Sequence, residues 1–126
     1  MKKEKIDIKY VVHPQLFQEY YNIIYQKLLP KPEIKRVCEL GAGGNPSLTV
    51  RVIEEQNLEY WITDVSKQAL SACPNSYQKK VLDVQSQDIE STLGKCDLIF
   101  SNMLIEHLPN PSIFHRYILN ALTPNG

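Results

Sequence analysis

The chain has 126 residues, of which 43% are hydrophobic and 22% are charged, and its 14 basic and 14 acidic side chains give a formal net charge of zero. This length suits one domain with a real hydrophobic core, and the balanced charge argues against a surface built mainly for nucleic acid or anionic lipid. No apolar run approaches the roughly 20 residues that span a bilayer, and the basic start lacks the apolar region of a secretory signal. The composition therefore predicts a soluble globular protein.

The cysteines point to a reducing compartment. Cys38, Cys73 and Cys96 are odd in number, lie far apart and form no CxxC motif. This pattern predicts reduced thiols in the cytoplasm rather than a disulfide framework or a metal site. Cys38 and Cys96 lie in apolar runs, so we expect both to be small buried side chains.

The first predicted element is a helix from Pro14 to Leu29, with apolar residues at helical spacing. Pro14 suits a first helical turn, and Pro30-Lys31-Pro32 ends the helix. We treat residues 1–33 as an N-terminal helical segment. Its tyrosines Tyr20 and Tyr21 are candidates for a lid over a ligand, with core packing as the plainer alternative.

From residue 34 onward, short apolar strands alternate with helices. The predicted strands are residues 34–40, 60–63, 80–82 and 97–100, the last of them buried on both faces. The predicted helices are residues 46–56, capped by Asn45, and residues 67–72, 86–93 and 112–122. Such alternation predicts an α/β fold, namely a Rossmann-like, doubly wound parallel sheet spanning residues 34–126.

The chain stops after the turn Leu122-Thr123-Pro124-Asn125-Gly126, with no strand after it. Sheets of this kind usually carry more than four strands, so we expect a domain that is incomplete at its C-terminal side. An uncovered fourth strand would be a candidate edge for self-association.

Polar and glycine residues follow each predicted strand. They are Gly41 to Gly44, Asp64, Asp83, and Ser101-Asn102. In an open parallel sheet, ligands bind beyond the carboxyl ends of the strands, so we expect these groups to meet at one edge. Each has a plainer structural alternative: a tight turn for the glycines, a helix cap for Asp64, and an ordinary strand exit for Asp83.

The spacing of these groups suits adenosine. Asp64 lies 23 residues beyond Gly41, which suits a carboxylate that accepts hydrogen bonds from the two ribose hydroxyls. Asp83 could accept from the adenine amine while the Val84 N–H donates to a ring nitrogen. The sequence therefore predicts an adenosine pocket.

The charges near the glycines favour one adenosine cofactor. A dinucleotide fingerprint would end in glycine, whereas this chain has Pro46 at that position, and Glu39 lies two places before Gly41. A carboxylate repels a pyrophosphate, which is also negatively charged, but attracts a cationic amine. S-adenosylmethionine carries an amine and a sulfonium and no phosphate, so we favour it over NAD.

Several motifs in order resemble those of the class I S-adenosylmethionine-dependent methyltransferases, especially their small-molecule group. The motifs are Val37-Cys38-Glu39-Leu40-Gly41-Ala42-Gly43, Tyr60-Trp61-Ile62-Thr63-Asp64-Val65, Val81-Leu82-Asp83-Val84, Cys96-Asp97-Leu98-Ile99-Phe100-Ser101-Asn102 and Ile105-Glu106-His107-Leu108-Pro109. The resemblance spans roughly residues 34–126. It departs at Asn45, where many members have a third glycine, and in the absence of later strands.

The resemblance implies a role for each matching residue. Glu39, Gly41, Ala42 and Gly43 would serve the methionine portion of the cofactor, Asp64 and Val65 the ribose, Asp83 and Val84 the adenine, and Ser101 and Asn102 the region of the sulfur. The implied activity is transfer of a methyl group to a small-molecule acceptor.

Two points stay open from the sequence. His107, next to Glu106, is the candidate general base, and its plainer role is to order the turn before the last helix. Two other classes remain as alternatives to a methyltransferase: a catalytically silent cofactor-binding fragment, and an NAD-type Rossmann oxidoreductase domain.

Overall fold

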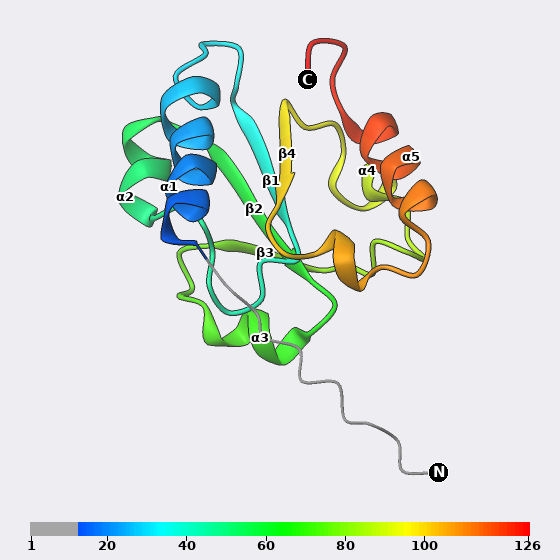
Figure 1. Ribbon diagram of the computed structural model, residues 1–126. Helices are drawn as coiled ribbons and strands as arrows, with labels where there is room; N and C mark the ends of the chain where they lie inside the picture. The colour runs from blue at the N-terminus through cyan, green and yellow to red at the C-terminus, as the bar shows by residue number, and fades with distance from the viewer. Residues whose placement is uncertain (1–12) are drawn as a thin grey trace. The chain divides into compact units, whose positions relative to one another are not determined.

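Four parallel strands form one sheet in the order β3-β2-β1-β4 in the computed structural model, which describes residues 13–126 (Figure 1). The strands are β1 (Arg36–Leu40), β2 (Glu59–Asp64), β3 (Gln78–Val81) and β4 (Leu98–Ser101). All neighbours run in parallel, so their carboxyl ends share one edge of the sheet. The predicted α/β, Rossmann-like class is confirmed.

The chain divides into two compact units, Met1–Lys31 and Pro32–Gly126. In the first unit, α1 (Pro14–Asn22) runs directly into η1 (Ile23–Leu28), whose hydrogen bonds have the wider π-helical pattern. The predicted helix from Pro14 is therefore confirmed, although its second half is wound more loosely than an α-helix. The rings of Tyr20 and Tyr21 pack edge to face, with centroids 5.3 Å apart.

The second unit carries the remaining helices. They are α2 (Val50–Glu55), α3 (Lys67–Ala72), α4 (Ile89–Leu93), the 3₁₀ turn η2 (Ile105–His107) and α5 (Pro111–Ala121). Ser66 caps α3, since its hydroxyl accepts from the N–H of Ala69 at 3.1 Å. The end of α5 lies within one residue of the predicted position.

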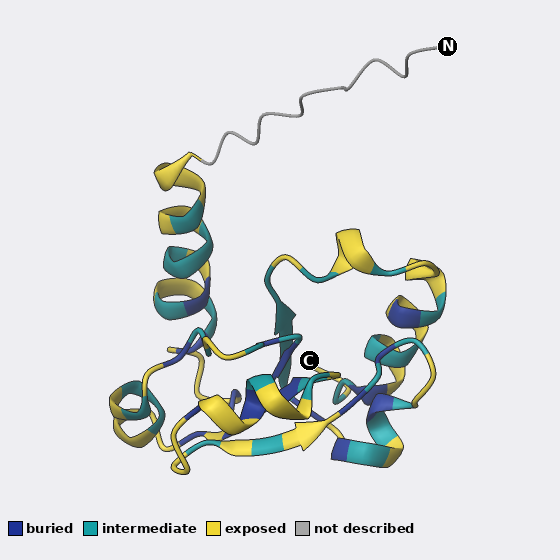
Figure 2. Cartoon of the chain, turned by 90° about the horizontal axis from the view of Figure 1, so that it is seen from below, coloured by how far each residue is buried: buried dark blue, intermediate teal, exposed yellow. Residues whose placement is uncertain are grey.

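One face of the sheet packs against α4 and α5. On β1, Cys38 and Leu40 point to this face and belong to a buried cluster with Leu93 of α4 and Phe114 of α5. Side chains alternate along a strand, so Val37 and Glu39 point to the opposite face. Figure 2 shows buried residues along the sheet and on the helices beside it. Cys38 and Cys96 are buried, as predicted.

The predicted start of α2 is wrong. The helix begins at Val50 rather than Pro46, and its cap is Thr49, whose hydroxyl accepts from the N–H of Val52 at 3.3 Å. The reason lies in Ser47, which donates its N–H to the Glu39 carboxylate at 2.9 Å. This contact holds residues 44–48 in an irregular loop.

Two further boundaries are also corrected. Strand β3 covers Gln78–Val81 rather than 80–82, because its pairing with β2 starts at Gln78. Helix α4 begins at Ile89 rather than Ser86, because the carbonyl of Asp83 accepts from the N–H groups of Ser86 and Gln87 and closes a separate turn first.

Strand β4 is less buried than predicted. All four of its residues are half-buried, whereas the prediction was burial on both faces. The reason is its place at one edge of the sheet, because within residues 13–126 it pairs with β1 and with no strand on its other side. Among residues 13–126, no helix combines the length and the apolar character needed to cross a membrane.

Candidate functional site

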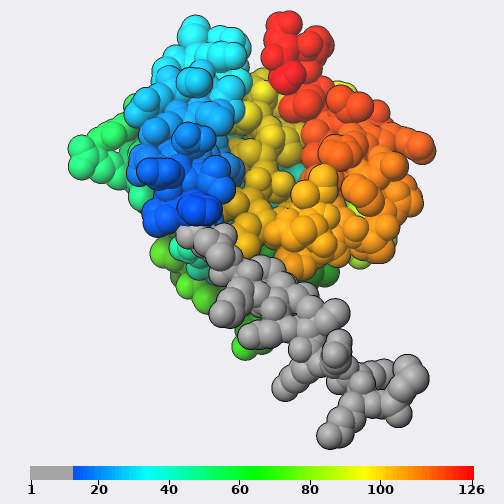
Figure 3. All heavy atoms as spheres, viewed as in Figure 1, coloured from blue at the N-terminus to red at the C-terminus, as the bar shows by residue number. Residues whose placement is uncertain are grey.

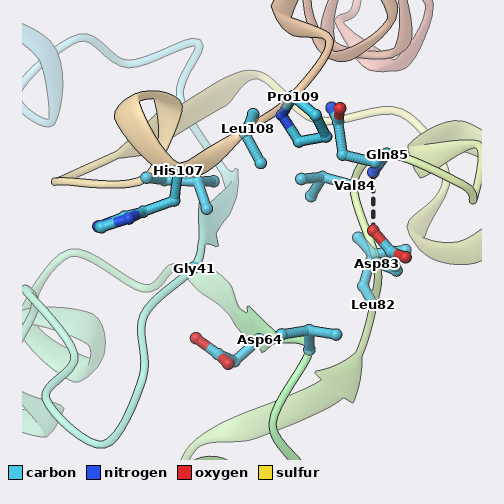
Figure 4. Close-up of a pocket in the computed structure, with 11 residues that line it drawn as sticks. Gly41, Asp64, Leu82, Asp83, Val84, Gln85, His107, Leu108 and Pro109 are labelled. Atoms are coloured by element: carbon cyan, nitrogen blue, oxygen red, sulfur yellow. Dashed lines mark hydrogen bonds between the residues drawn. The ribbon is translucent and has the colours of Figure 1, made fainter.

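A cavity of about 330 Å³ opens where the carboxyl ends of β1, β2 and β3 meet (Figure 4). This volume lies at the lower end of the range of about 300–1,000 Å³ for small-molecule pockets. Six of the predicted site residues line it: Gly41, Asp64, Val65, Asp83, Val84 and His107. The topology therefore brings together residues that are up to 66 positions apart in the chain.

The glycine turn after β1 is fastened to the end of β2. The N–H of Ala42 donates to the carbonyl of Thr63 at 2.8 Å, and the N–H of Gly43 donates to Oδ2 of Asp64 at 2.8 Å. Gly41 has φ +69°, a backbone conformation that glycine adopts without strain. A Cβ at Gly41 would lie 2.9 Å from Cδ1 of Leu104, which lines the same cavity.

Asp64 is oriented by backbone donors. Its Oδ2 accepts from Gly43, and its Oδ1 accepts from the N–H of Ser66 at 2.8 Å. An ionised carboxylate offers about four acceptor positions, so two remain for a ligand. The side chain is half-buried, lies against the cavity and is fixed in place.

Asp83 is oriented in a similar way on the next strand end. Its Oδ1 accepts from the N–H of Gln85 at 2.9 Å, and its Oδ2 accepts from the hydroxyl of Ser86 at 2.8 Å. These hydrogen bonds, led by that of the Gln85 N–H, lower the pKa of the Asp83 carboxyl below its ordinary value. Asp83 is therefore an anion at neutral pH.

The N–H of Val84 remains available to a ligand. Within residues 13–126 it donates neither to a backbone carbonyl nor to a side chain. Val84 itself is buried and forms part of the cavity wall. A ligand at this wall thus meets a backbone donor beside the Asp83 carboxylate.

The sequence analysis assigned no binding role to five other lining residues. They are Leu82, Gln85, Leu104, Leu108 and Pro109. Most of them are apolar, and three come from the segment after β4, which lies at the surface beside α5 (Figure 3). The apolar content of residues 104–109, directly after a predicted strand, was the signal that could have identified this wall.

Gln85 joins the two sides of the cavity. Its Nε2 donates to the carbonyl of Asn110 at 3.1 Å, and its Oε1 accepts from the N–H of Asn110 at 2.8 Å. This double hydrogen bond ties the loop after β3 to the segment before α5. It therefore fixes the spacing between the Asp83 turn and the apolar wall.

The charge of the cavity is negative. Two carboxylates line it, and none of the lining residues within 13–126 is lysine or arginine. The N–H groups of Ala42 and Gly43 are already used, and α2 begins only at Val50. The usual donors for a pyrophosphate, a glycine turn that leads directly into a helix N-terminus, are thus not presented here.

His107 lies across the cavity from Asp83 and Gln85 in Figure 4. Its side chain is 74% exposed, and its Nε2 is 3.9 Å from Oε1 of Glu106. The imidazole therefore lies largely in solvent, and the charged group beside it comes from the preceding residue.

The other predicted site residues lie outside the cavity lining. Ala42 and Gly43 support the glycine turn, Ser101 ends β4, and Asn102 follows it. Glu39 is 2% exposed on the opposite face of the sheet from α4 and α5. Its carboxylate accepts from Ser47 and from Tyr60.

A second, more open cavity of about 320 Å³ lies beside α3 and β3. Lys67 and Lys79 line it, and Nζ of Lys79 donates to the carbonyl of Cys73. In the part of the chain that the structure describes, no group of three or more His, Cys, Asp or Glu side chains is placed to hold a metal ion.

Comparison with known proteins gives one family. Residues 39–126 match the family model described as a methyltransferase domain. No curated protein sequence matches the chain significantly.

Solved structures share the fold. An S-adenosylmethionine-dependent methyltransferase from Mesorhizobium loti superposes with a TM-score of 0.62 at 17% identity, over 82% of this chain and 50% of that protein. An S-adenosylmethionine-dependent methyltransferase from Clostridium acetobutylicum superposes with a TM-score of 0.58 at 16% identity, over 89% of this chain and 54% of that protein. The plantazolicin methyltransferase BpumL, solved in complex with S-adenosylhomocysteine, superposes with a TM-score of 0.56 at 17% identity, over 85% of this chain and 40% of that protein. The chain therefore spans about half the length of these proteins.

Proposed function

This chain belongs to the methyltransferase-domain family, and from that premise we propose that it binds S-adenosylmethionine in the cavity and transfers the methyl group to a small molecule. The observation that carries the proposal is the lining of the cavity. Asp64 ends β2, Asp83 follows the end of β3, and the Val84 N–H is available beside them. Among residues 13–126, neither lysine nor arginine lines the cavity.

The donors and acceptors fit adenosine. Asp64 retains two acceptor positions, as a ribose with two hydroxyls requires. Asp83 and the Val84 N–H offer the acceptor and the donor that an adenine amine and its neighbouring ring nitrogen need. Leu104 and Leu108 supply apolar surface against which the ring can pack.

The described part of the chain places neither lysine nor arginine at the cavity, which favours S-adenosylmethionine over NAD. A pyrophosphate would be placed among carboxylates, whereas a sulfonium and an amine are attracted to them. The Gly41 to Gly43 turn would serve the methionine portion, and Ser101 and Asn102 would lie toward the sulfur. Val65 would cover the ribose beside Asp64.

The residues of the chain have a limited chemical task. When bound, S-adenosylmethionine supplies a methyl group on a sulfonium, which is already a strong methyl donor. The walls formed by Leu82, Leu104 and Leu108 exclude water and orient the bound molecule. His107 would accept a proton only for an acceptor that must lose one, and its exposed imidazole is accessible for that purpose.

A small molecule is the acceptor class that we propose. The exposed apolar residues Met103 and Ile105 flank the lining residue Leu104 in the sequence. The net charge of zero offers no general attraction for nucleic acid. An uncharged or cationic acceptor suits a negatively charged cavity better than a carboxylate or a phosphate ester does.

The experiment that tests the proposed function is calorimetric titration of the purified chain with S-adenosylhomocysteine, with NAD as the comparison ligand and circular dichroism to verify folding. We expect saturable binding of S-adenosylhomocysteine and no measurable binding of NAD. A folded chain that binds NAD in preference, or binds neither ligand, would contradict the proposal.

A further inference from the structure

A buried polar cluster lies behind the glycine turn, on the face of the sheet opposite α4 and α5. We define it as the Glu39 cluster: Glu39, Ser47 and Tyr60. Oε1 of Glu39 accepts from the hydroxyl of Ser47 at 2.6 Å, and Oε2 accepts from the N–H of Ser47 at 2.9 Å and from the hydroxyl of Tyr60. Glu39 and Tyr60 are each 2% exposed.

The Tyr60 ring of the cluster packs against two other aromatic side chains. The ring of Tyr60 stacks on Phe100 with centroids 6.5 Å apart and meets Tyr77 edge to face at 6.2 Å. Burial, followed by the nearby Glu39 charge, raises the pKa of the Tyr60 hydroxyl far above its ordinary value. The Tyr60 hydroxyl is therefore protonated at neutral pH, where it donates to Glu39.

The same cluster fixes the loop that follows the glycine turn. At one end of the loop, the N–H of Gly43 is bound to Asp64. Four residues later, both the N–H and the hydroxyl of Ser47 are bound to Glu39. The hydroxyl of Tyr77 also donates to the carbonyl of Leu48 at 2.8 Å. The chain from residue 43 to residue 48 is thus anchored at both ends.

This arrangement differs from a direct contact between Glu39 and a cofactor. Three donors already occupy the carboxylate, out of about four positions that it offers. The residue is 2% exposed and does not line the cavity.

We propose that Glu39 is a positioning residue, whose buried carboxylate holds Ser47 and thereby fixes the glycine turn that lines the cavity, without touching the cofactor. This inference rests on the proposed function for its binding readout. Removing the carboxylate frees the loop, so the turn must be ordered again each time a ligand binds, and that ordering weakens binding.

The first part of the test needs no ligand. Amide hydrogen exchange is measured on the full chain and on the variants Glu39→Gln and Tyr60→Phe. The matched control is Glu55→Gln, because Glu55 is exposed and its carboxylate accepts from Nε of Arg51 in the same helix, at 2.7 Å. We expect exchange at residues 43–48 to rise by about tenfold in Glu39→Gln, less in Tyr60→Phe, and not at all in the control.

The second part compares two ligands. The two probes are S-adenosylhomocysteine and its deaminated analogue, which keeps the adenosine, the sulfur, the carbon chain and the carboxylate but has hydrogen in place of the amino group. Positioning by Glu39 predicts that Glu39→Gln weakens both by the same factor, about fivefold or more. A loss confined to S-adenosylhomocysteine would overturn the proposal and assign Glu39 to the amine.

The two proposals fail in different ways. A wild-type chain that binds neither ligand contradicts the proposed function, while the exchange experiment still tests the loop. Unchanged exchange at residues 43–48 in Glu39→Gln overturns the positioning role even when both ligands bind. If Glu39→Gln does not fold, Ser47→Ala removes one of the three donors and gives a milder test of the same anchor.

Discussion

Replacing Asp64 with alanine is expected to weaken S-adenosylhomocysteine binding by about 1.5–3 kcal/mol, or roughly tenfold to 150-fold. The physical reason is that the variant loses the charged carboxylate that accepts hydrogen bonds from the ribose hydroxyls in the cavity. Asp64 also holds the N–H groups of Gly43 and Ser66, so the glycine turn loses part of its support at the same time. Calorimetric titration of the wild type and the variant measures the difference.

A second aspartate, Asp88, provides a control that separates an effect on ligand binding from an effect on folding stability. Asp88 also accepts from a backbone N–H, that of Glu90 at 3.3 Å, but it caps α4 outside the cavity lining. Asp88→Ala should cost about 1 kcal/mol of stability through the lost cap and leave the binding constant unchanged. Equal affinity of Asp64→Ala and the wild type would remove Asp64 from the site.

Replacing Gly41 with alanine is expected to reduce both stability and binding. Gly41 has φ +69°, which costs a side-chain-bearing residue about 1–2 kcal/mol. The added Cβ would lie 2.9 Å from Cδ1 and 3.3 Å from Cβ of Leu104, so Leu104 must move within the cavity wall. We expect the melting temperature to fall by roughly 3–8 °C, and binding to fall with it.

Gly44 is the matched control in the same turn. A Cβ there would lie 3.5 Å from the carbonyl oxygen of Ala69, which is an ordinary contact, and its φ is not in the left-handed region. Gly44→Ala should therefore change stability by no more than about 0.5 kcal/mol. If Gly41→Ala behaved like Gly44→Ala in thermal unfolding and in titration, the close contact between Gly41 and Leu104 would not matter for the site.

The regular elements could be predicted from the sequence because their signals are local. Neighbouring apolar residues such as Val37 and Cys38 point to opposite faces of a strand, so their burial indicates a sheet covered on both faces. Ser66 caps α3 by a hydrogen bond to a residue three positions later. The start of α2 could not be predicted in this way. Asn45 and Pro46 are good local start signals, but a buried carboxylate eight residues before Ser47 holds that segment in a loop.

The site could be predicted in part for the same reason. Parallel strands bring their carboxyl ends to one edge, so Gly41, Asp64 and Asp83 could be expected near one another from the alternation alone. The opposite wall was not assigned, because the apolar content of residues 104–109 signals burial but does not fix where the loop that carries them lies. The double hydrogen bond between Gln85 and Asn110 that fixes this loop joins residues 25 positions apart.

The central claim is that this cavity holds S-adenosylmethionine, and nuclear magnetic resonance of the ¹⁵N-labelled chain tests it most directly. Titration with S-adenosylhomocysteine should shift the amide signals of Gly41, Asp64, Val84 and Leu104, and leave those of Lys67 and Lys79 in the second cavity unchanged. The Val84 amide should shift most, because its N–H gains an acceptor. Shifts confined to the second cavity, or no shifts at saturating ligand, would contradict the account.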